Sequence, residues 1–489
     1  MKKFNTIIRH LSHINTLSQI SSLLSWDQET YMPPDAINAR ASQLQVMAGL
    51  IHDEWQSDEL KNELNQYFDF TSYTIDDSLS SEEYSFIKEL SSTWIRNTRL
   101  TKSLVQELTK ATTTAQHAWA SARKNDDFAT FAPYLKNVID LTREKIKQLG
   151  SNDHPYNTLL DEFEPGMTVN ELDNIFTPLK NETINFLNEY SPSTPPSING
   201  PFDYEQQLIY SKELMTMLGY DTKRGRLDIS THPFTIDIHP NDVRITTRIN
   251  TNYLMESISS TIHEVGHGLY EQGLDPQWAG TPYGSARSMG IHESQSRLWE
   301  IFIGQSLPFW EGQLDRLQTL FPSTKSNSAM DFHQHCRTIK PHWCRVESDI
   351  ITYNLHIILR YECEKALFSN ELDVDMLPEF WNQKMNDYLG IKSLTPAKGC
   401  LQDVHWSAGL FGYFPSYTLG TLIAAELFKH LSKLFFPIDQ KIRNGEFKPI
   451  KDWLNEHIHF QGSKKTTHQL LDDLGISYNP ASFLNSFIP

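Results

Sequence analysis

Most of the chain alternates apolar and polar positions with the spacing of an α-helix. Apolar residues recur three and four positions apart over long stretches with few glycines, as in helices that bury one face. The N-terminal third, through about Leu149, predicts several long helices. No Gly/Ser-rich or Pro-rich linker and no internal repeat divides the 489 residues, so the pattern predicts a mainly α protein with one continuous body.

One short segment follows a strand pattern instead. Phe234, Ile236 and Ile238 alternate with other residues, a turn follows at 240–242, and Val243 and Ile245 alternate after it. This predicts a β-hairpin directly before the next helix. An exposed strand edge at that place would suit a substrate backbone that binds as an added strand.

The helix after the hairpin is predicted between 250 and 273. Asn250 and Thr251 offer side-chain oxygens for its N-cap, and Gly273 marks its end. Its length is about six turns. Its apolar residues recur at helical spacing: Leu254, Ile258, Ile262, Val265 and Leu269.

Within this helix lies the run His263-Glu264-Val265-Gly266-His267. Positions four apart share one helix face, so the two imidazoles can bind one metal ion, and Glu264 can reach a water beside it. Such a run also arises by chance, but its place in an amphipathic helix favours a metal site. Two imidazoles and a nearby glutamate are the minimum that a zinc-assisted peptide hydrolase needs.

Catalytic zinc usually takes a third protein ligand. No third histidine follows at short spacing, and the next candidates are His292 and Glu293, where a second helix starts and continues to about Phe302. We predict that Glu293 is the third ligand. We expect His292 to contact a ligand without binding the metal itself. The alternative for Glu293 is a solvated carboxylate at the start of a helix.

These motifs, with others, resemble the thermostable (Taq-type) zinc metallocarboxypeptidases. Weaker likeness extends over nearly the whole chain, including Trp26-Asp27-Gln28, His154-Pro155-Tyr156 and Glu164-Pro165-Gly166-Met167. The signatures that carry the resemblance are, in order, His232-Pro233-Phe234, Asp242-Val243-Arg244-Ile245-Thr246, the 263–267 run, His292-Glu293-Ser294-Gln295, Arg345-Val346-Glu347-Ser348-Asp349 and Gly399-Cys400-Leu401-Gln402-Asp403-Val404-His405-Trp406.

The resemblance implies a gluzincin-like helical fold with a deep groove and a small sheet beside the zinc helix. It implies one catalytic domain over 1–489, in which the helices of roughly 1–150 form one wall of the groove. It also implies one Zn²⁺ per subunit, with Co²⁺ or Mn²⁺ as other metals that such ligands accept. His263, His267 and Glu293 would be the ligands and Glu264 the general base. Members commonly form homodimers.

Further site residues are predicted from the same signatures and from the stretch 412–417, which is rich in aromatic residues and glycine. His405 and Tyr417 are candidates to stabilise the oxyanion, with buried packing roles as the alternative. Arg345, or secondly Arg244, would bind the substrate α-carboxylate, although either could pair with its local acid, Asp349 or Asp242, instead. Gln402 and Asp403 are also assigned to the substrate site, where Asp403 would orient His405.

Three positions depart from the family pattern. Cys344 precedes Arg345 where Ile or Asn is usual, Ile350 stands where an acidic residue is common, and Gln461 stands where a second histidine is frequent. None coincides with a predicted ligand or base. They bear on substrate recognition.

Composition limits the partners and the compartment. The net charge of −17 argues against nucleic acid and anionic membranes, which bind basic faces. Four cysteines show neither a metal spacing nor a disulfide framework, and there is no signal peptide or apolar run long enough to span a bilayer. We therefore predict a cytoplasmic enzyme.

The predicted function is removal of single residues from the free C-terminus of peptides, with broad specificity. A zinc endo-oligopeptidase or dipeptidase with the same ligands is the first alternative. A non-catalytic peptide-binding protein is the second, and Glu264 argues against it, because a purely structural metal site needs no base.

Overall fold

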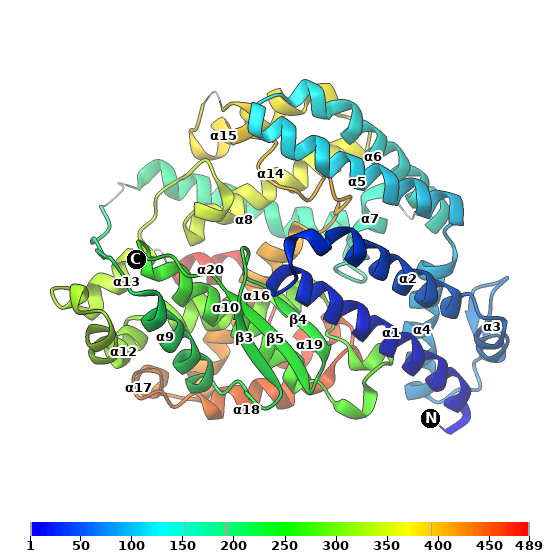
Figure 1. Cartoon of the computed structure of the whole chain (residues 1–489), viewed down its shortest axis with the longest axis horizontal. Coiled ribbons are helices and arrows are strands. Elements are labelled where there is room, and N and C mark those ends of the chain that lie inside the picture. The colour runs from blue at the N-terminus through cyan, green and yellow to red at the C-terminus, as the bar shows by residue number, and fades with distance from the viewer. Residues whose placement is uncertain (1, 152, 191–193, 393, 488–489) are drawn as a thin grey trace.

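Helices make up most of the protein, which confirms the mainly α prediction (Figure 1). The computed structural model describes residues 2–151, 153–190, 194–392 and 394–487. The helices are α1 (Asn5–Thr30), α2 (Ile37–Trp55), α3 (Asp58–Leu64), α4 (Ser81–Thr98), α5 (Lys102–Asn125), α6 (Phe128–Leu149), α7 (Pro155–Leu160), α8 (Val169–Glu189), α9 (Tyr204–Met217), α10 (Leu254–Gly273), α11 (Met289–Arg297), α12 (Leu307–Leu320), α13 (Ala329–Arg337), α14 (Ile350–Phe368), α15 (Leu377–Leu389), α16 (Pro415–Leu434), α17 (Ile438–Arg443), α18 (Lys448–His457), α19 (Thr467–Leu474) and α20 (Pro480–Asn485).

A three-stranded sheet lies near the middle of the molecule, beside α10 (Figure 1). Strands β4 (Thr235–His239) and β5 (Asp242–Thr247) form the predicted antiparallel hairpin. Strand β3 (Gly225–Ile229), which was not predicted, pairs in parallel with β5, so the order is β3-β5-β4 and β4 is an edge. A second, two-stranded ribbon joins β1 (Phe68–Asp69) to β2 (Thr74–Ile75).

The buried apolar side chains form two clusters. The larger one runs from α5 and α6 through α10, α14 and α16 to the C-terminal helices. The apolar face of α10 predicted from the sequence belongs to it, since Ile258, Ile262, Val265 and Leu269 are all buried there. The smaller cluster joins α1, α3 and α4 with Tyr283. The assignment of 1–489 to one catalytic domain stays a prediction.

Helix α1 runs beside the sheet and contacts β4 (Figure 1). A cavity of about 380 Å³ lies where α1 and α4 face the edge strand β4. Its lining includes residues of α1 and α4, Asp237 of β4 and Glu271 of α10. Among the described helices, none combines the length and the apolar character needed to cross a bilayer.

Candidate metal centre and active site

Helix α10 carries His263 and His267 on the face opposite its apolar stripe. The helix starts at Leu254 with Tyr253 as its N-cap, so the predicted caps at Asn250 and Thr251 are wrong. Asn250 instead accepts a hydrogen bond from the backbone N–H of Asn252 in the preceding turn. The predicted end is correct, because Gly273 is the last helical residue.

Helix α11 brings Glu293 to the same place. Its N-cap is Ser288, whose hydroxyl accepts a hydrogen bond from the N–H of Ile291, and the chain continues beyond the helix as a π-helical segment, Leu298–Gly304. The helix predicted to run from about 290 to 302 is therefore present in two parts.

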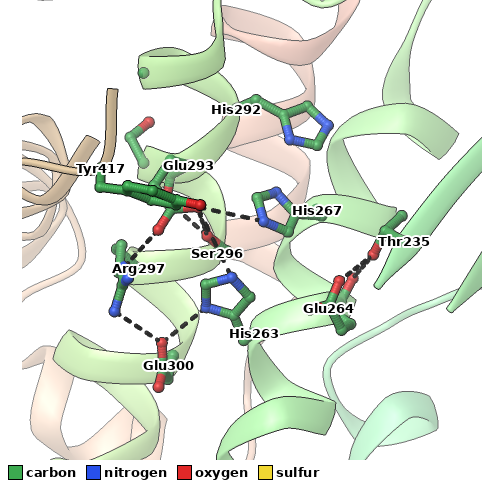
Figure 2. A network of polar contacts seen from close by, with 12 residues as sticks. Thr235, His263, Glu264, His267, His292, Glu293, Ser296, Arg297, Glu300 and Tyr417 are labelled. Carbon is green, nitrogen blue, oxygen red and sulfur yellow. Dashed lines mark hydrogen bonds and ion pairs between the residues drawn. The ribbon is translucent and has the colours of Figure 1, made fainter. Parts of the chain in front are cut away.

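Three donor atoms converge between these helices (Figure 2). The ligand atoms of His263, His267 and Glu293 all lie within 4.8 Å of one another. The Nε2 atoms of His263 and His267 lie 3.8 and 3.4 Å from Oε2 of Glu293. Ligand atoms that are about 2.1 Å from a tetrahedral zinc lie about 3.4 Å apart. Two imidazoles and a carboxylate at this spacing fit a zinc-type metal ion.

Acidic and basic neighbours orient two of these side chains. His263 uses Nδ1 to contact Glu300 at 2.8 Å, which directs its Nε2 toward Glu293. Arg297, one turn after Glu293, donates from Nε to Oε1 of Glu293 at 2.6 Å. Figure 2 shows these pairs along one side of the cluster.

The second imidazole has a different environment. His267 stacks on His292, with ring centroids 4.4 Å apart, and His292 in turn contacts Glu271 at 2.8 Å. His292 therefore packs against a proposed ligand and lies outside the three-residue cluster. Nδ1 of His267 is buried and has no hydrogen-bond partner among the described protein groups.

The electrostatics of the cluster favour a cation. Burial alone would raise the pKa of Glu293, but Arg297, His263 and His267 outweigh it and hold that pKa well below its usual range. Burial likewise opposes the charged form of His263, yet Glu293 and Glu300 raise its pKa to about 9. Because a metal ligand must be deprotonated, a metal ion and a proton compete for this imidazole.

Glu264 lies beside the cluster without joining it. Its Oε2 accepts a hydrogen bond of 2.7 Å from the Thr235 hydroxyl on the edge strand β4 (Figure 2). Burial raises the pKa of Glu264, while His263 and the Thr235 hydroxyl act against the rise. A buried carboxylate of raised pKa next to a metal site has the properties of a general base.

His405 and Tyr417 lie next to each other, outside the three-residue cluster. The Tyr417 hydroxyl and Nε2 of His405 are 3.5 Å apart, and Tyr413 packs edge-on against Tyr417. Tyr417 projects from α16 toward Glu293 (Figure 2). Burial lowers the pKa of His405 to about 4 and raises that of Tyr417 well above its usual value, so both are neutral near pH 7.

Arg345 does not pair with Asp349, the local partner considered from the sequence. Asp349 instead caps α14, while Arg345 donates from Nε and Nη2 to Asp403 and from Nη1 to the Tyr353 hydroxyl at 2.8 Å. Arg360 holds the other oxygen of Asp403. This buried network explains why the pKa of Asp403 lies well below its usual range despite its burial.

The remaining predicted residues have defined partners. The Gln402 side chain accepts from the Arg345 N–H and donates to the carbonyl of Trp343. Asp403 lies 4.0 Å from Nδ1 of His405, beyond hydrogen-bond distance. Arg244 pairs with Asp242 through two hydrogen bonds of 2.8 and 2.9 Å, and its guanidinium lies over Trp26.

Comparison with known proteins identifies the family. The model of the carboxypeptidase Taq (M32) metallopeptidases matches residues 6–488. The chain belongs to the M32 family. It is therefore a metallopeptidase of the metallocarboxypeptidase class, as its motifs predicted.

Relatives of this M32 protein cover nearly its full length. Thermostable carboxypeptidase 1 of Thermus thermophilus is 40% identical over 92% of this chain and 90% of its own length. Carboxypeptidase 1 of Bacillus subtilis is 38% identical, with 96% and 94% covered. The solved Pyrococcus furiosus carboxypeptidase has a TM-score of 0.94 at 32% identity, covering 100% of this chain and 98% of that one.

Two residues that support the metal centre of this M32 protein were not singled out from the sequence. Arg297 and Glu300 lie four and seven positions after Glu293, so helical spacing places them on the same side of the chain. That spacing was the available signal. Thr235 gave no such signal, because it reaches Glu264 only through the packing of β4 on α10.

The three departures from the family pattern lie outside the cluster. Cys344 precedes Arg345 and accepts through its carbonyl from the Ser348 hydroxyl. Ile350 is the first residue of α14, and the Gln461 amide donates to the carbonyl of Glu456. The histidine nearby, His459, is buried and contacts Gln295 at 2.9 Å.

Proposed function

We propose that this M32 protein is a zinc-dependent carboxypeptidase that removes single residues from the free C-terminus of peptides with broad specificity. The observation that carries the proposal is the convergence of His263, His267 and Glu293 with Glu264 beside them. His263, His267 and Glu293 would hold the metal. A bound Zn²⁺ would polarise the scissile carbonyl and lower the pKa of the attacking water.

Glu264 performs the proton transfers. Its carboxylate takes a proton from the attacking water and later delivers it to the nitrogen of the leaving amino acid. Thr235 holds the Glu264 carboxylate at 2.7 Å, which limits its motion and leaves its other oxygen for the water. His405 and Tyr417, neutral near pH 7, donate hydrogen bonds to the oxyanion that forms on the carbonyl.

Arg345 binds the α-carboxylate of the substrate. Asp403, Gln402 and Tyr353 hold the guanidinium and its backbone in place. Its guanidinium lies 5.3 Å from the ring centre of Tyr417, which places it beside the proposed oxyanion donor. Arg244 is the second candidate, although its pairing with Asp242 and its stacking on Trp26 favour a role in the sheet.

Glu264→Gln tests the mechanism. We expect the variant to keep its metal, because the ligands are unchanged, and to lose turnover by about 100-fold or more, because the amide cannot take the proton. Metal content by mass spectrometry and the rate on a blocked peptide provide the two measurements. Turnover at the level of the unmodified enzyme would refute the role of Glu264.

The compartment and the assembly are also proposed. All four cysteines are unpaired, which supports a reducing compartment such as the cytoplasm. The family resemblance supports a homodimer. The strongly negative net charge supports peptides, rather than nucleic acid, as the partners.

A further inference from the structure

The Glu164-Pro165-Gly166-Met167 motif has no part in the proposed reaction, yet its carboxylate lies deep in the protein. Glu164 is 2% exposed and follows α7 in a tight loop. Burial raises its pKa to about 7, although the hydroxyls of Ser416 and Ser288 act against the rise. A carboxyl group buried in this way is costly unless hydrogen-bond donors satisfy it.

One oxygen of Glu164 joins the first turns of two helices. Oε1 accepts from the backbone N–H of Gly290 at 2.5 Å and from the hydroxyl of Ser416 at 2.6 Å. Gly290 lies in the first turn of α11, where backbone N–H groups have no partner within the helix. Ser416 lies in the first turn of α16.

The backbone of α11 lies close to this carboxyl group. A Cβ atom on Gly290 would lie 2.9 Å from Oε1 of Glu164, so a larger residue there would force the carboxyl group to shift. One turn further along, a Cβ atom on Gly420 of α16 would lie 2.6 Å from Cβ of Glu293. Helices α11 and α16 therefore touch at Glu293 and are joined at their first turns by Glu164.

Each of the two helices carries one proposed functional side chain close to its hydrogen bond with Glu164. Glu293 is three residues after Gly290, and Tyr417 directly follows Ser416. A shift of either first turn would therefore move a proposed metal ligand or a proposed oxyanion donor.

We propose that Glu164 is a positioning residue that fixes the start of α11 against the start of α16, and so sets the place of Glu293 in the metal centre and of Tyr417 beside it. The inference rests on the proposed function in one respect, the role of Glu293 as a ligand. Glu164 itself touches neither the metal position nor the substrate.

Zinc affinity of the folded protein is the main test. Loss of a direct outer contact to a metal ligand typically weakens metal binding by about 10- to 100-fold. Glu164 acts on Glu293 only through the start of α11, so we expect the low end of this range, about 10-fold, for Glu164→Ala in competition with a chromophoric chelator. The visible spectrum of the Co²⁺-loaded variant should also change, because it reports ligand geometry. Glu164→Gln should keep the zinc affinity and the Co²⁺ spectrum of the unmodified protein, since its amide oxygen can still accept from Gly290 and Ser416.

Glu364→Ala is the matched control. Glu364 is also a fully buried carboxyl group whose pKa is raised by burial to about 7, and it accepts from the Tyr156 hydroxyl, the Trp406 indole and the Gly412 N–H. None of these donors belongs to α11. This variant should lose stability while it keeps zinc affinity and the cobalt spectrum.

The outcomes separate the two proposals. If Glu293→Gln loses zinc while Glu164→Ala binds it normally with an unchanged cobalt spectrum, the positioning role is overturned and the metal site stands. Equal weakening by Glu364→Ala would also overturn it, as a general loosening. Normal zinc binding by Glu293→Gln would overturn the metal site and this inference together. If Glu164→Ala does not fold, Glu164→Met fills the volume without an acceptor and carries the same expectation.

Discussion

At the scale of single residues, Arg345 is held by a network of buried hydrogen bonds. Asp403 takes two of its N–H groups and the Tyr353 hydroxyl takes a third. Tyr353 also lies against Arg297, the residue that holds Glu293, since the Arg297 guanidinium is 5.0 Å from the Tyr353 ring centre. Arg345 is thus held rigidly and connected to the metal centre through one aromatic ring.

Arg345→Lys tests whether this guanidinium recognises the free C-terminus. Lysine keeps the charge but loses the planar, bidentate geometry. A hydrogen bond to a charged group contributes about 1.5–3 kcal/mol, so kcat/KM for a free-acid peptide should fall by about 10- to 100-fold. The preference for the free acid over the same peptide amidated at its C-terminus should shrink. An equal loss on both peptides would indicate a structural role instead.

Glu364 supplies a prediction about pH and stability. Its folded pKa of about 7 lies above the usual 4.5, so between these values the folded protein holds a proton that the unfolded chain has released. Stability therefore falls as pH rises through this window. The shift corresponds to about 3 kcal/mol.

Glu364→Gln removes this titration because the amide stays neutral. The variant should gain thermal stability relative to the unmodified protein as pH rises from 4.5 to 7.5. Unfolding temperatures of both proteins in matched buffers provide the measurement. A constant difference across the range would show that Glu364 titrates normally.

At the scale of secondary-structure elements, glycine sets the distances among the three helices of the metal centre. A Cβ atom on Gly266, within the 263–267 run, would lie 2.5 Å from the Cα of Ser296 on α11. Because a backbone atom cannot move aside as a side chain can, α10 and α11 approach this closely only at glycine. Gly420 serves the same purpose between α16 and α11.

Gly266→Ala sets two effects against each other. Alanine favours a helix over glycine by about 1 kcal/mol, but the added methyl group would push α11 away, and overpacking of this kind costs about 1–3 kcal/mol. We expect the packing cost to prevail and the free energy of unfolding in urea to fall. A more stable variant would mean that the two helices are not in close contact here.

Local sequence patterns predicted the secondary-structure elements around the site. They did not predict which distant residues pair with one another. The hairpin, α10 and the start of α11 follow from periodicity and turn residues within a few positions of one another. Strand β3 was missed because its parallel pairing with β5 is not local. For Arg345 the sequence offered Asp349 only as a possible local ion-pair partner, whereas the partner in the structure, Asp403, lies 58 positions away.

At the scale of the whole molecule, the candidate site is assembled from distant parts of the chain. Thr235 comes from the sheet, Glu264 from α10, Glu293 from α11 and Tyr417 from α16, and Glu164, which lies outside the site, comes from a loop after α7. The large apolar cluster unites these elements, so the geometry of the candidate site depends on packing throughout the core. The motifs predict the three ligands, and the fold shows which residues hold those side chains in place.

The position of cleavage tests the central claim most directly. A peptide of about eight residues with a blocked N-terminus would be incubated with the enzyme and zinc or cobalt, with and without a chelator, and followed by mass spectrometry. We predict stepwise loss of single residues from the C-terminus, which the chelator stops and added metal restores. Internal fragments would instead show an endopeptidase, and no cleavage with any metal would contradict the enzymatic assignment of this site.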